Sequence, residues 1–279
     1  MKIMTLNTHS LIEENYSEKL CAFVNAIAAE KPEIIALQEV NQTISAPPVR
    51  GEINGYFPCC DSAVIKTDNH AYRTAEMLRE KGMNYHWTWL PLKKGYDILD
   101  EGIAVMSIGS ILEAVIIPVS KADDYDNWKT RKLLGIRTQT MPDEWFFSVH
   151  YGWWNDSDDP FRDQWLKTMY SLKKYESVWL LGDFNNPAQV RGEGYDMVKS
   201  CYWHDSFCLA EKKDDGITVG GNIDGWRDGS MCPNGMRIDQ IWSRKKAVVT
   251  SSRVIFNGKK YPVVSDHYGI IIDYERSIV

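Results

Sequence analysis

The sequence predicts an α/β fold in which β-sheets are covered on one face by helices. Short apolar runs of strand length recur along the chain, some continuous and some alternating with polar residues. Three segments with the apolar spacing of amphipathic helices lie among them. The chain has 279 residues and 44% hydrophobic content, enough for a substantial core, and we expect residues 1–279 to form a single domain.

The first predicted strand, Lys2–Leu6, is followed by a helix. Asn15 is expected to cap this helix, with Glu18 reaching back to it. The apolar stripe of the helix consists of Leu20, Phe23, Val24, Ile27 and Ala28. Pro32 ends the helix before a second strand, Ile34–Leu37.

Two more helices are predicted further along the chain. One runs from about Asn69 to Lys81 and is stopped by Gly82. The other begins near residues 158–159 with Pro160 in its first turn. Its expected buried face consists of Phe161, Trp165, Leu166, Met169 and Leu172. The remaining predicted strands are Gly102–Ser107, Ile111–Ile117, Leu133–Arg137, Trp145–Val149, Val178–Leu181, Met236–Trp242, Val248–Phe256, Pro262–Val264 and Gly269–Ile272.

Polar side chains recur where these strands end. The tetrapeptide Gly182-Asp183-Phe184-Asn185 follows one buried run directly. Other strands end in, or contain, Asn7, Glu39, His150, Asp239, Asp266 and His267. Carboxylate and amide oxygens are the ligands that Mg²⁺ and Mn²⁺ prefer, so the pattern predicts one convergent metal site. Two long irregular segments, Asn41–Asp68 and Asp214–Gly235, are expected to leave the same rim.

Each of these residues also has a structural explanation. Glu39 could form a salt bridge or cap the next element. Asp183 and Asn185 point the same way on an extended backbone, but could instead form an Asx-turn. His267 could transfer a proton or stabilise charge, with its ring held by Asp239. His150 could be a structural histidine, stack on substrate or protonate a leaving group.

Composition narrows the class of partner. Acidic residues outnumber basic ones, and the formal net charge is −6. Proteins that bind a nucleic-acid backbone usually have a basic face, so a small phosphorylated substrate is favoured. A local basic groove is compatible with the same net charge. Arg131 precedes a buried strand and suits phosphate binding, with a solvated basic stretch as the alternative.

Location is inferred from the same composition. The apolar runs are too short to span a bilayer, and no secretory signal is seen. Six cysteines without a CxxC pair are expected to be reduced thiols rather than zinc ligands. We therefore expect a cytoplasmic protein with neither a membrane contact nor an obligate protein partner.

Six blocks in their order and spacing resemble the endonuclease/exonuclease/phosphatase superfamily. They are Thr5-Leu6-Asn7, Leu37-Gln38-Glu39-Val40, Ser148-Val149-His150, Gly182-Asp183-Phe184-Asn185, Arg237-Ile238-Asp239-Gln240-Ile241 and Ser265-Asp266-His267. The resemblance covers nearly the whole chain. It implies one catalytic domain with a four-layer sandwich, in which two packed mixed sheets are flanked by helices. It also implies hydrolysis of a phosphoester with Mg²⁺, or Mn²⁺ as a substitute.

The resemblance also implies a role for each matched residue. Glu39 would bind the metal, with Asn7 and Asp266 nearby. Asp183 would orient or deprotonate the attacking water, and Asn185 would contact the phosphate.

The two histidines have separate implied roles. His267, paired with Asp239, would stabilise the transition state. His150 matches a second histidine found in only some branches, and its carboxylate partner is expected to be Asp100 or Glu101.

Three further stretches resemble a bacterial branch that contains maltose 6'-phosphate phosphatases. They are Asn7-Thr8-His9-Ser10, Gly152-Trp153-Trp154-Asn155-Asp156 and the later Pro160-Phe161 with Gln164-Trp165. This implies a sugar phosphate such as maltose 6'-phosphate as substrate and a place in carbohydrate metabolism. Tryptophans in or near predicted loops offer flat faces for sugar rings, although core packing is their alternative; they are Trp87, Trp89, Trp153, Trp154 and Trp226. We expect the last three, with Arg131, to bind substrate.

Two other functions compete with a sugar phosphatase. A Mg²⁺-dependent endonuclease or exonuclease would act on DNA with a steep salt dependence. A binding module of the same fold without catalysis is the second alternative. A lipid phosphodiesterase is disfavoured because no exposed apolar hairpin for membrane docking is evident.

Overall fold

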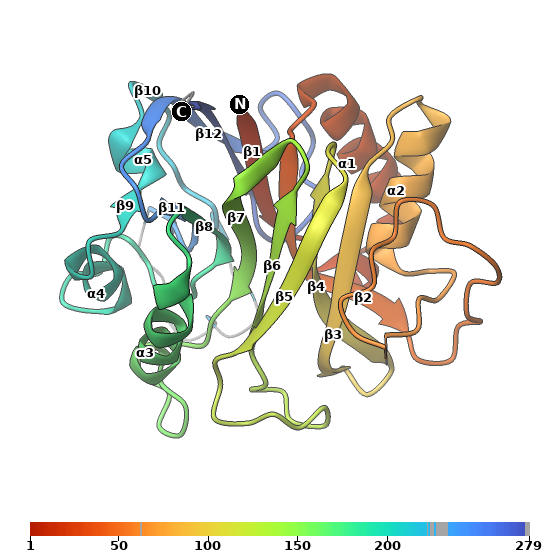
Figure 1. Cartoon of the computed structure of the whole chain (residues 1–279), viewed down its shortest axis with the longest axis horizontal. Coiled ribbons are helices and arrows are strands. Elements are labelled where there is room, and N and C mark those ends of the chain that lie inside the picture. Colours follow the sequence, from red (N-terminus) through yellow and green to blue (C-terminus); the bar gives the residue numbers. More distant parts are fainter. Residues whose placement is uncertain (62, 222, 224–225, 227–233, 277–279) are drawn as a thin grey trace.

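A computed structural model describes residues 1–61, 63–221, 223, 226 and 234–276 of the chain (Figure 1). Two β-sheets pack face to face, and helices cover the outer face of each sheet. The predicted four-layer α/β sandwich is therefore confirmed. Among the described helices, none combines the length and apolar character needed to cross a bilayer.

The first sheet consists of β1 (Lys2–Asn7), β2 (Ile34–Thr43), β3 (His86–Gly95), β4 (Leu99–Ser107), β10 (Lys212–Lys213), β12 (Val248–Ile255) and β13 (Gly269–Glu275). The second consists of β5 (Ile111–Pro118), β6 (Lys132–Thr138), β7 (Met141–His150), β8 (Val178–Asp183), β9 (His204–Asp205) and β11 (Asp239–Ser243). The helices are α1 (Tyr16–Glu30), α2 (His70–Glu80), α3 (Phe161–Ser171), α4 (Gly194–Ser200) and α5 (Ser206–Leu209), with 3₁₀ turns at Ser10–Ile12 and Leu172–Lys174.

Both sheets mix parallel and antiparallel pairs. Their strand orders are β10-β12-β13-β1-β2-β4-β3 and β5-β6-β7-β8-β11-β9. The parallel pairs β1/β2 and β7/β8 lie near the middle of each sheet, and their carboxyl ends carry predicted site residues. This topology brings those ends to one rim of the sandwich.

Alternation of side chains along the strands divides the core into layers. In β1, Ile3 packs between the two sheets, and Met4 packs under α1 and α2. In β8, Trp179 lies between the sheets, and Leu180 packs on the side of α3 and α4. Both faces of these strands are thus buried, which explains their continuous apolar sequences.

Two helix details differ from the prediction. Asn15 precedes α1 but makes no capping hydrogen bond, because its backbone is left-handed with φ of 55°. Leu166 of α3 is 55% exposed rather than buried. The inward positions belong instead to Gln164 and Thr168, which hydrogen-bond to the buried residues Gly152 and Tyr151. The short α4 was not predicted.

Two strand predictions also need correction, and one long strand was missed. Residues 262–264 form no strand, because β12 pairs directly with β13 and Pro262 has no N–H to donate. The strand predicted from Met236 starts at Asp239. Strand β3 was not predicted, and its Trp87 and Trp89 are core residues rather than loop aromatics.

The irregular segments agree with the prediction in the residues described. Strand β2 continues to Thr43, and the described residues from 44 to 69 (all but residue 62) form no helix or strand. In the second segment, Val219 and Met236 form a backbone bridge with N···O distances of 2.8 and 3.0 Å. Cys232 lies outside the described residues, and Cys21, Cys59, Cys201 and Cys208 are free thiols.

Candidate active site

Strand register places three predicted site residues side by side. In the parallel pair β7/β8, His150 lies opposite Asp183. In the antiparallel pair β8/β11, Asp239 also lies opposite Asp183. Asn7 ends β1 of the other sheet and reaches Asp183 across the gap between the sheets. The carboxylate of Asp183 is therefore the centre of the arrangement.

A buried polar contact joins the two sheets beneath this centre. Gln38 Nε2 donates to Ser148 Oγ over 2.9 Å, and Ser148 Oγ donates to the carbonyl of Leu37 over 2.9 Å. Thr5 Oγ1 lies 3.2 Å from Gln38 Oε1. These residues hold β1, β2 and β7 in fixed relation, so they position the side chains at the rim.

Gly182 permits the close approach of β7 and β8 just below Asp183. A Cβ at this position would lie 1.9 Å from the carbonyl oxygen of Val149 and 2.9 Å from Gln38 Nε2. No side chain fits in that space. The glycine before Asp183 is therefore required by packing.

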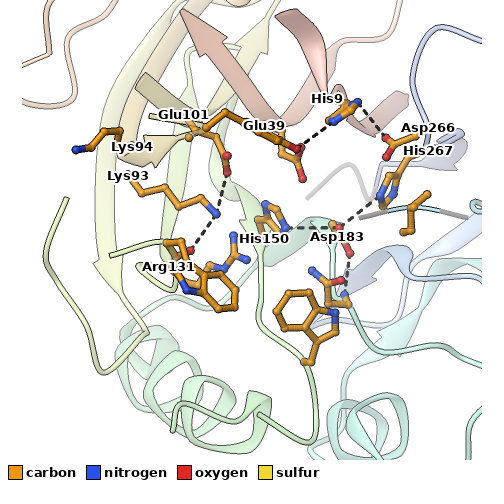
Figure 2. Close-up of a pocket in the computed structure, with 16 residues that line it drawn as sticks. His9, Glu39, Lys93, Lys94, Glu101, Arg131, His150, Asp183, Asp266 and His267 are labelled. Carbon is orange, nitrogen blue, oxygen red and sulfur yellow. Dashed lines mark hydrogen bonds and ion pairs between the residues drawn. The ribbon is translucent and has the colours of Figure 1, made fainter. Parts of the chain in front are cut away.

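The site residues line a cavity of about 250 Å³ (Figure 2). Eight of the predicted residues lie on its wall: Glu39, Arg131, His150, Trp153, Asp183, Asn185, Asp266 and His267. Asn7 and Asp239 are buried behind them and hydrogen-bond to them. The structure thus brings together all the predicted catalytic and metal residues.

Asp183 is surrounded by groups that can hold a reactant. Its Oδ2 accepts from Asn7 Nδ2 over 3.2 Å and lies 3.6 Å from His150 Nε2 and 4.0 Å from His267 Nε2. Its Oδ1 accepts from the backbone N–H of Asn185 over 2.8 Å. Burial, and then the charge of Asp239, raises the pKa of Asp183 to about 7. A carboxylate in this range can accept a proton near neutral pH.

His267 is held by Asp239 as the sequence predicts. The distance from its Nδ1 to Asp239 Oδ2 is 2.9 Å. Burial lowers the pKa of His267, but the charge and hydrogen bond of Asp239 outweigh it and raise that pKa well above its usual value. The imidazole is therefore cationic, and its Nε2 faces Asp183.

His150 differs from His267 in both charge and partner. Burial, followed by the charges of Arg131 and Lys93, lowers the pKa of His150 well below its usual value. The expected partnership with Asp100 or Glu101 is wrong. Asp100 pairs with Lys66 at 3.0 Å, and Glu101 pairs with Lys93 at 3.1 Å. Both carboxylates therefore pair with lysines, and among the described residues the acid closest to His150 is Asp183, at 3.6 Å.

Glu39 sits in a strained part of β2. The register with β4 shifts between Leu37 and Val40, and Glu39 adopts φ of 50°. Such bulges re-aim a side chain, and left-handed backbone is costly for a residue other than glycine. The strain directs the carboxylate into the cavity, where Asn7 Nδ2 donates to it over 2.9 Å.

The acids at this end of the cavity fit a hard divalent cation. Burial raises the pKa of Glu39, and the charges of Glu101 and Asp266 raise it further. Each of these two carboxylates therefore repels that of Glu39. Asp266 also forms a close group with His9 and Glu13. Carboxylate oxygens with unneutralised charge are the donor set that Mg²⁺ or Mn²⁺ satisfies.

The predicted substrate-binding residues have different positions. Arg131 and Trp153 line the cavity. Trp226 Nε1 donates to Asn185 Oδ1 over 3.2 Å, so it supports a wall residue. Trp154 instead packs against the core cluster under α3 and does not line the cavity, so this structure does not place it beside the other predicted substrate-binding residues.

Several cavity residues were missed at the sequence level. His9 is not among the predicted site residues, yet it lines the cavity with its Nδ1 2.8 Å from Glu13 Oε1. Its position two residues after Asn7 was the available signal. Lys93 and Trp128 also line the cavity. Lys93 lies in β3, which was not predicted, and no motif marks Trp128.

The fold is shared with solved structures. No protein-family model and no curated protein matches the chain. It is similar to an endonuclease/exonuclease/phosphatase family protein from Leptotrichia buccalis, with a TM-score of 0.85 and 29% identity over 99% of this chain and 100% of that one. A mannosyl-6-phosphatase from Bacteroides thetaiotaomicron gives a TM-score of 0.64 and 15% identity over 99% and 100% of the two chains. A 3' phosphatase from Neisseria bound to a product DNA hairpin gives a TM-score of 0.63 and 17% identity, over 99% of this chain and 100% of that one.

Proposed function

We propose that residues 1–279 form one catalytic domain of a metal-dependent phosphoester hydrolase, a phosphomonoesterase of the endonuclease/exonuclease/phosphatase family. One observation carries the proposal. The carboxylate of Asp183 has two imidazole nitrogens within 3.6 and 4.0 Å of one oxygen and lies in the same cavity as Glu39 and Asp266. A water and a phosphoryl group fit this combination of base, cation and acid cluster.

Glu39, Asp266 and the amide of Asn7 would hold Mg²⁺, with Mn²⁺ as a substitute. When bound, the ion supplies charge neutralisation and polarises the phosphoryl group. Asp183 orients the attacking water and accepts its proton.

The remaining groups stabilise charge on the phosphoryl oxygens. The imidazolium of His267, held by Asp239, donates from Nε2. Neutral His150 would hydrogen-bond to the same oxygens. Asn185 Nδ2 donates to the carbonyl of Tyr151 over 2.9 Å, and its second N–H would donate to the phosphoryl group. Water attacks directly, so no covalent enzyme intermediate forms.

The proposed substrate is a small sugar phosphate such as maltose 6'-phosphate. The cavity is small for a ligand pocket and carries the exposed ring of Trp128 beside Trp153, with ring centroids 5.7 Å apart. Such a pair suits a sugar ring bound next to its phosphate. The net charge of −6 disfavours a nucleic-acid backbone. The free thiols of Cys21, Cys59, Cys201 and Cys208 support a place in the cytoplasm. A sugar phosphate as substrate would give the enzyme a role in carbohydrate metabolism.

A phosphate-release screen tests the proposal. Purified protein is incubated with Mg²⁺ and a panel of sugar phosphates, inositol phosphates and nucleotides, and a plasmid-nicking assay runs in parallel. We expect Mg²⁺-dependent phosphate release, fastest with a sugar phosphate. Nicking without phosphate release would make the chain a nuclease. Inactivity in both assays, with Mg²⁺ or Mn²⁺, would leave a binding module.

A further inference from the structure

Two buried cations line the cavity on the side away from the acid cluster. Lys93 of β3 is 7% exposed, and Arg131, just before β6, is 4% exposed. In Figure 2 both lie on one side of His150 and Asp183, whereas His9 and Asp266 lie on the other. The cavity therefore has a cationic wall, formed by Lys93 and Arg131, opposite an acidic one.

The cationic wall is only partly neutralised by the protein. Lys93 Nζ lies 3.1 Å from Glu101 Oε1 and donates to the carbonyl of Trp128 over 3.0 Å. Arg131 Nη1 is buried without a hydrogen-bond partner among the described residues. Burial and the charge of Arg131 lower the pKa of Lys93, so the two cations repel each other. A buried donor without a partner is costly, and a bound anion would supply the missing acceptor.

The neighbouring lysine shows that this arrangement is specific to Lys93. Lys94 also lines the cavity, but its Nζ pairs with Asp126 at 2.7 Å, and Figure 2 shows it directed away from Arg131. Consecutive strand residues point to opposite faces, so only one of the two lysines faces Arg131.

The chemistry of phosphoesters identifies the anion. A phosphomonoester has three non-ester oxygens and nearly two negative charges at neutral pH. A phosphodiester has two such oxygens, a single charge and a second organic arm. The acidic wall would hold the metal, and the cationic wall faces it. Positive groups on two sides of the phosphoryl group match the greater charge of the monoester better than that of the diester.

We propose that Lys93 is a specificity-determining residue which, with Arg131, binds a non-ester oxygen that a phosphomonoester has and a diester lacks. This inference rests on the proposed function, because it concerns the substrate class of the same site. It accounts for a buried lysine that the hydrolytic roles of Asp183 and His267 do not require.

Binding measurements test the inference without turnover. Isothermal titration calorimetry at pH 8 with Mg²⁺ compares inorganic phosphate with dimethyl phosphate. Wild type is expected to prefer inorganic phosphate. Lys93→Met should weaken phosphate binding roughly tenfold or more and change dimethyl phosphate binding much less. Equal losses for both anions, no loss, or no preference in wild type would overturn the inference.

The matched control is Lys66→Met. Lys66 pairs with Asp100 at 3.0 Å, next to Glu101 on β4, but it does not line the cavity. This variant removes an equivalent lysine–carboxylate pair from the other face of the sheet. Phosphate affinity should stay within about twofold of wild type.

Lys93 could act only by neutralising Glu101, and a double variant separates that role. Lys93→Met leaves Glu101 buried and unpaired, which itself repels anions and lowers stability. Lys93→Met/Glu101→Gln removes both charges and should fold. If Lys93 contacts the anion, the double variant stays weak for phosphate; recovery of wild-type affinity would show that Lys93 only balances Glu101.

Turnover separates this inference from the proposed function. With p-nitrophenyl phosphate, Lys93→Met should raise KM more than it lowers kcat. A wild type that prefers inorganic phosphate but hydrolyses no ester would contradict the proposed function. If the wild type is a phosphatase and the Lys93→Met variant still prefers inorganic phosphate over dimethyl phosphate, only the inference is contradicted.

Discussion

At each end of strand β1 a polar side chain contacts a buried carboxylate, and the two carboxylates have opposite surroundings. At its start, Lys2 contacts Glu30, which is 7% exposed. Glu30 also forms ion pairs with Arg253 and, at 2.8 Å, with Lys260, and it accepts a hydrogen bond from the hydroxyl of Tyr261 over 2.9 Å. Burial alone would raise the pKa of Glu30, but these donors outweigh it and lower the pKa far below its usual value.

At the other end of β1, Asn7 contacts Asp183, whose pKa is raised to about 7. Here Asp239 adds a second negative charge, and Asp239 Oδ1 is buried without a partner among the described residues. The first cluster is saturated by its own chain, whereas the second keeps donors and acceptors free for a ligand. Stability is expected to reside in the first and activity in the second.

The largest expected effect is the loss of activity on removing the charge of Asp183. Asp183→Asn should lower kcat by roughly 10³-fold or more, because the proton acceptor is lost. Its melting temperature should stay level or rise, because repulsion with Asp239 disappears. Phosphate-release kinetics and calorimetry measure the two effects. A stable variant with near-normal kcat would assign the base elsewhere.

Metal dependence is the next expected effect. EDTA should abolish turnover, and added Mg²⁺ should restore it. Glu39→Gln should raise the Mg²⁺ concentration for half-maximal activity by at least roughly tenfold, because a charged ligand becomes neutral. Titration of Mg²⁺ into both proteins checks this. An unchanged Mg²⁺ requirement would remove Glu39 from the metal site.

A stability loss is expected at the saturated cluster. Glu30→Gln should lower the free energy of unfolding at pH 7 by about 2 kcal/mol and leave kcat unchanged. The lowered folded-state pKa means that Glu30 stabilises the protein fully above its unfolded pKa of about 4.5, and that this contribution is lost as pH falls below it. Urea unfolding at pH 7 and pH 3 should show the two proteins converging. A difference that does not narrow would contradict the cluster's role.

The smallest expected effect concerns support of the site. Trp226→Phe removes the 3.2 Å hydrogen bond to Asn185 Oδ1 and should lower kcat about fivefold. Trp154→Phe is the matched control, because Trp154 lies outside the cavity and should keep its turnover. Equal losses in both variants would indicate a general packing effect.

The sequence predicts the architecture and the rim because both depend on local patterns. Apolar runs mark β1, β2, β7 and β8, and polar residues at their ends mark the site. Errors arise where tertiary contacts override local preference. Leu166 is exposed because two polar residues of α3 have buried partners, and residues 262–264 are no strand because β12 and β13 pair with each other.

The cationic wall could not be predicted from sequence. Lys93 lies in a strand that contains Pro91 near its middle, and its pairing with Glu101 depends on the register of β3 with β4. Motifs record residues that are close along the chain. They do not record which lysine meets which arginine across two sheets.

The contact between Gln38 and Ser148 has a practical consequence for engineering. The two halves of the site belong to different sheets, and this amide–hydroxyl link keeps them in alignment. Libraries that aim to change substrate preference should therefore keep both residues fixed and vary the cavity mouth around Tyr96 and Trp128. Altering the link instead would shift one half of the machinery against the other for every substrate alike.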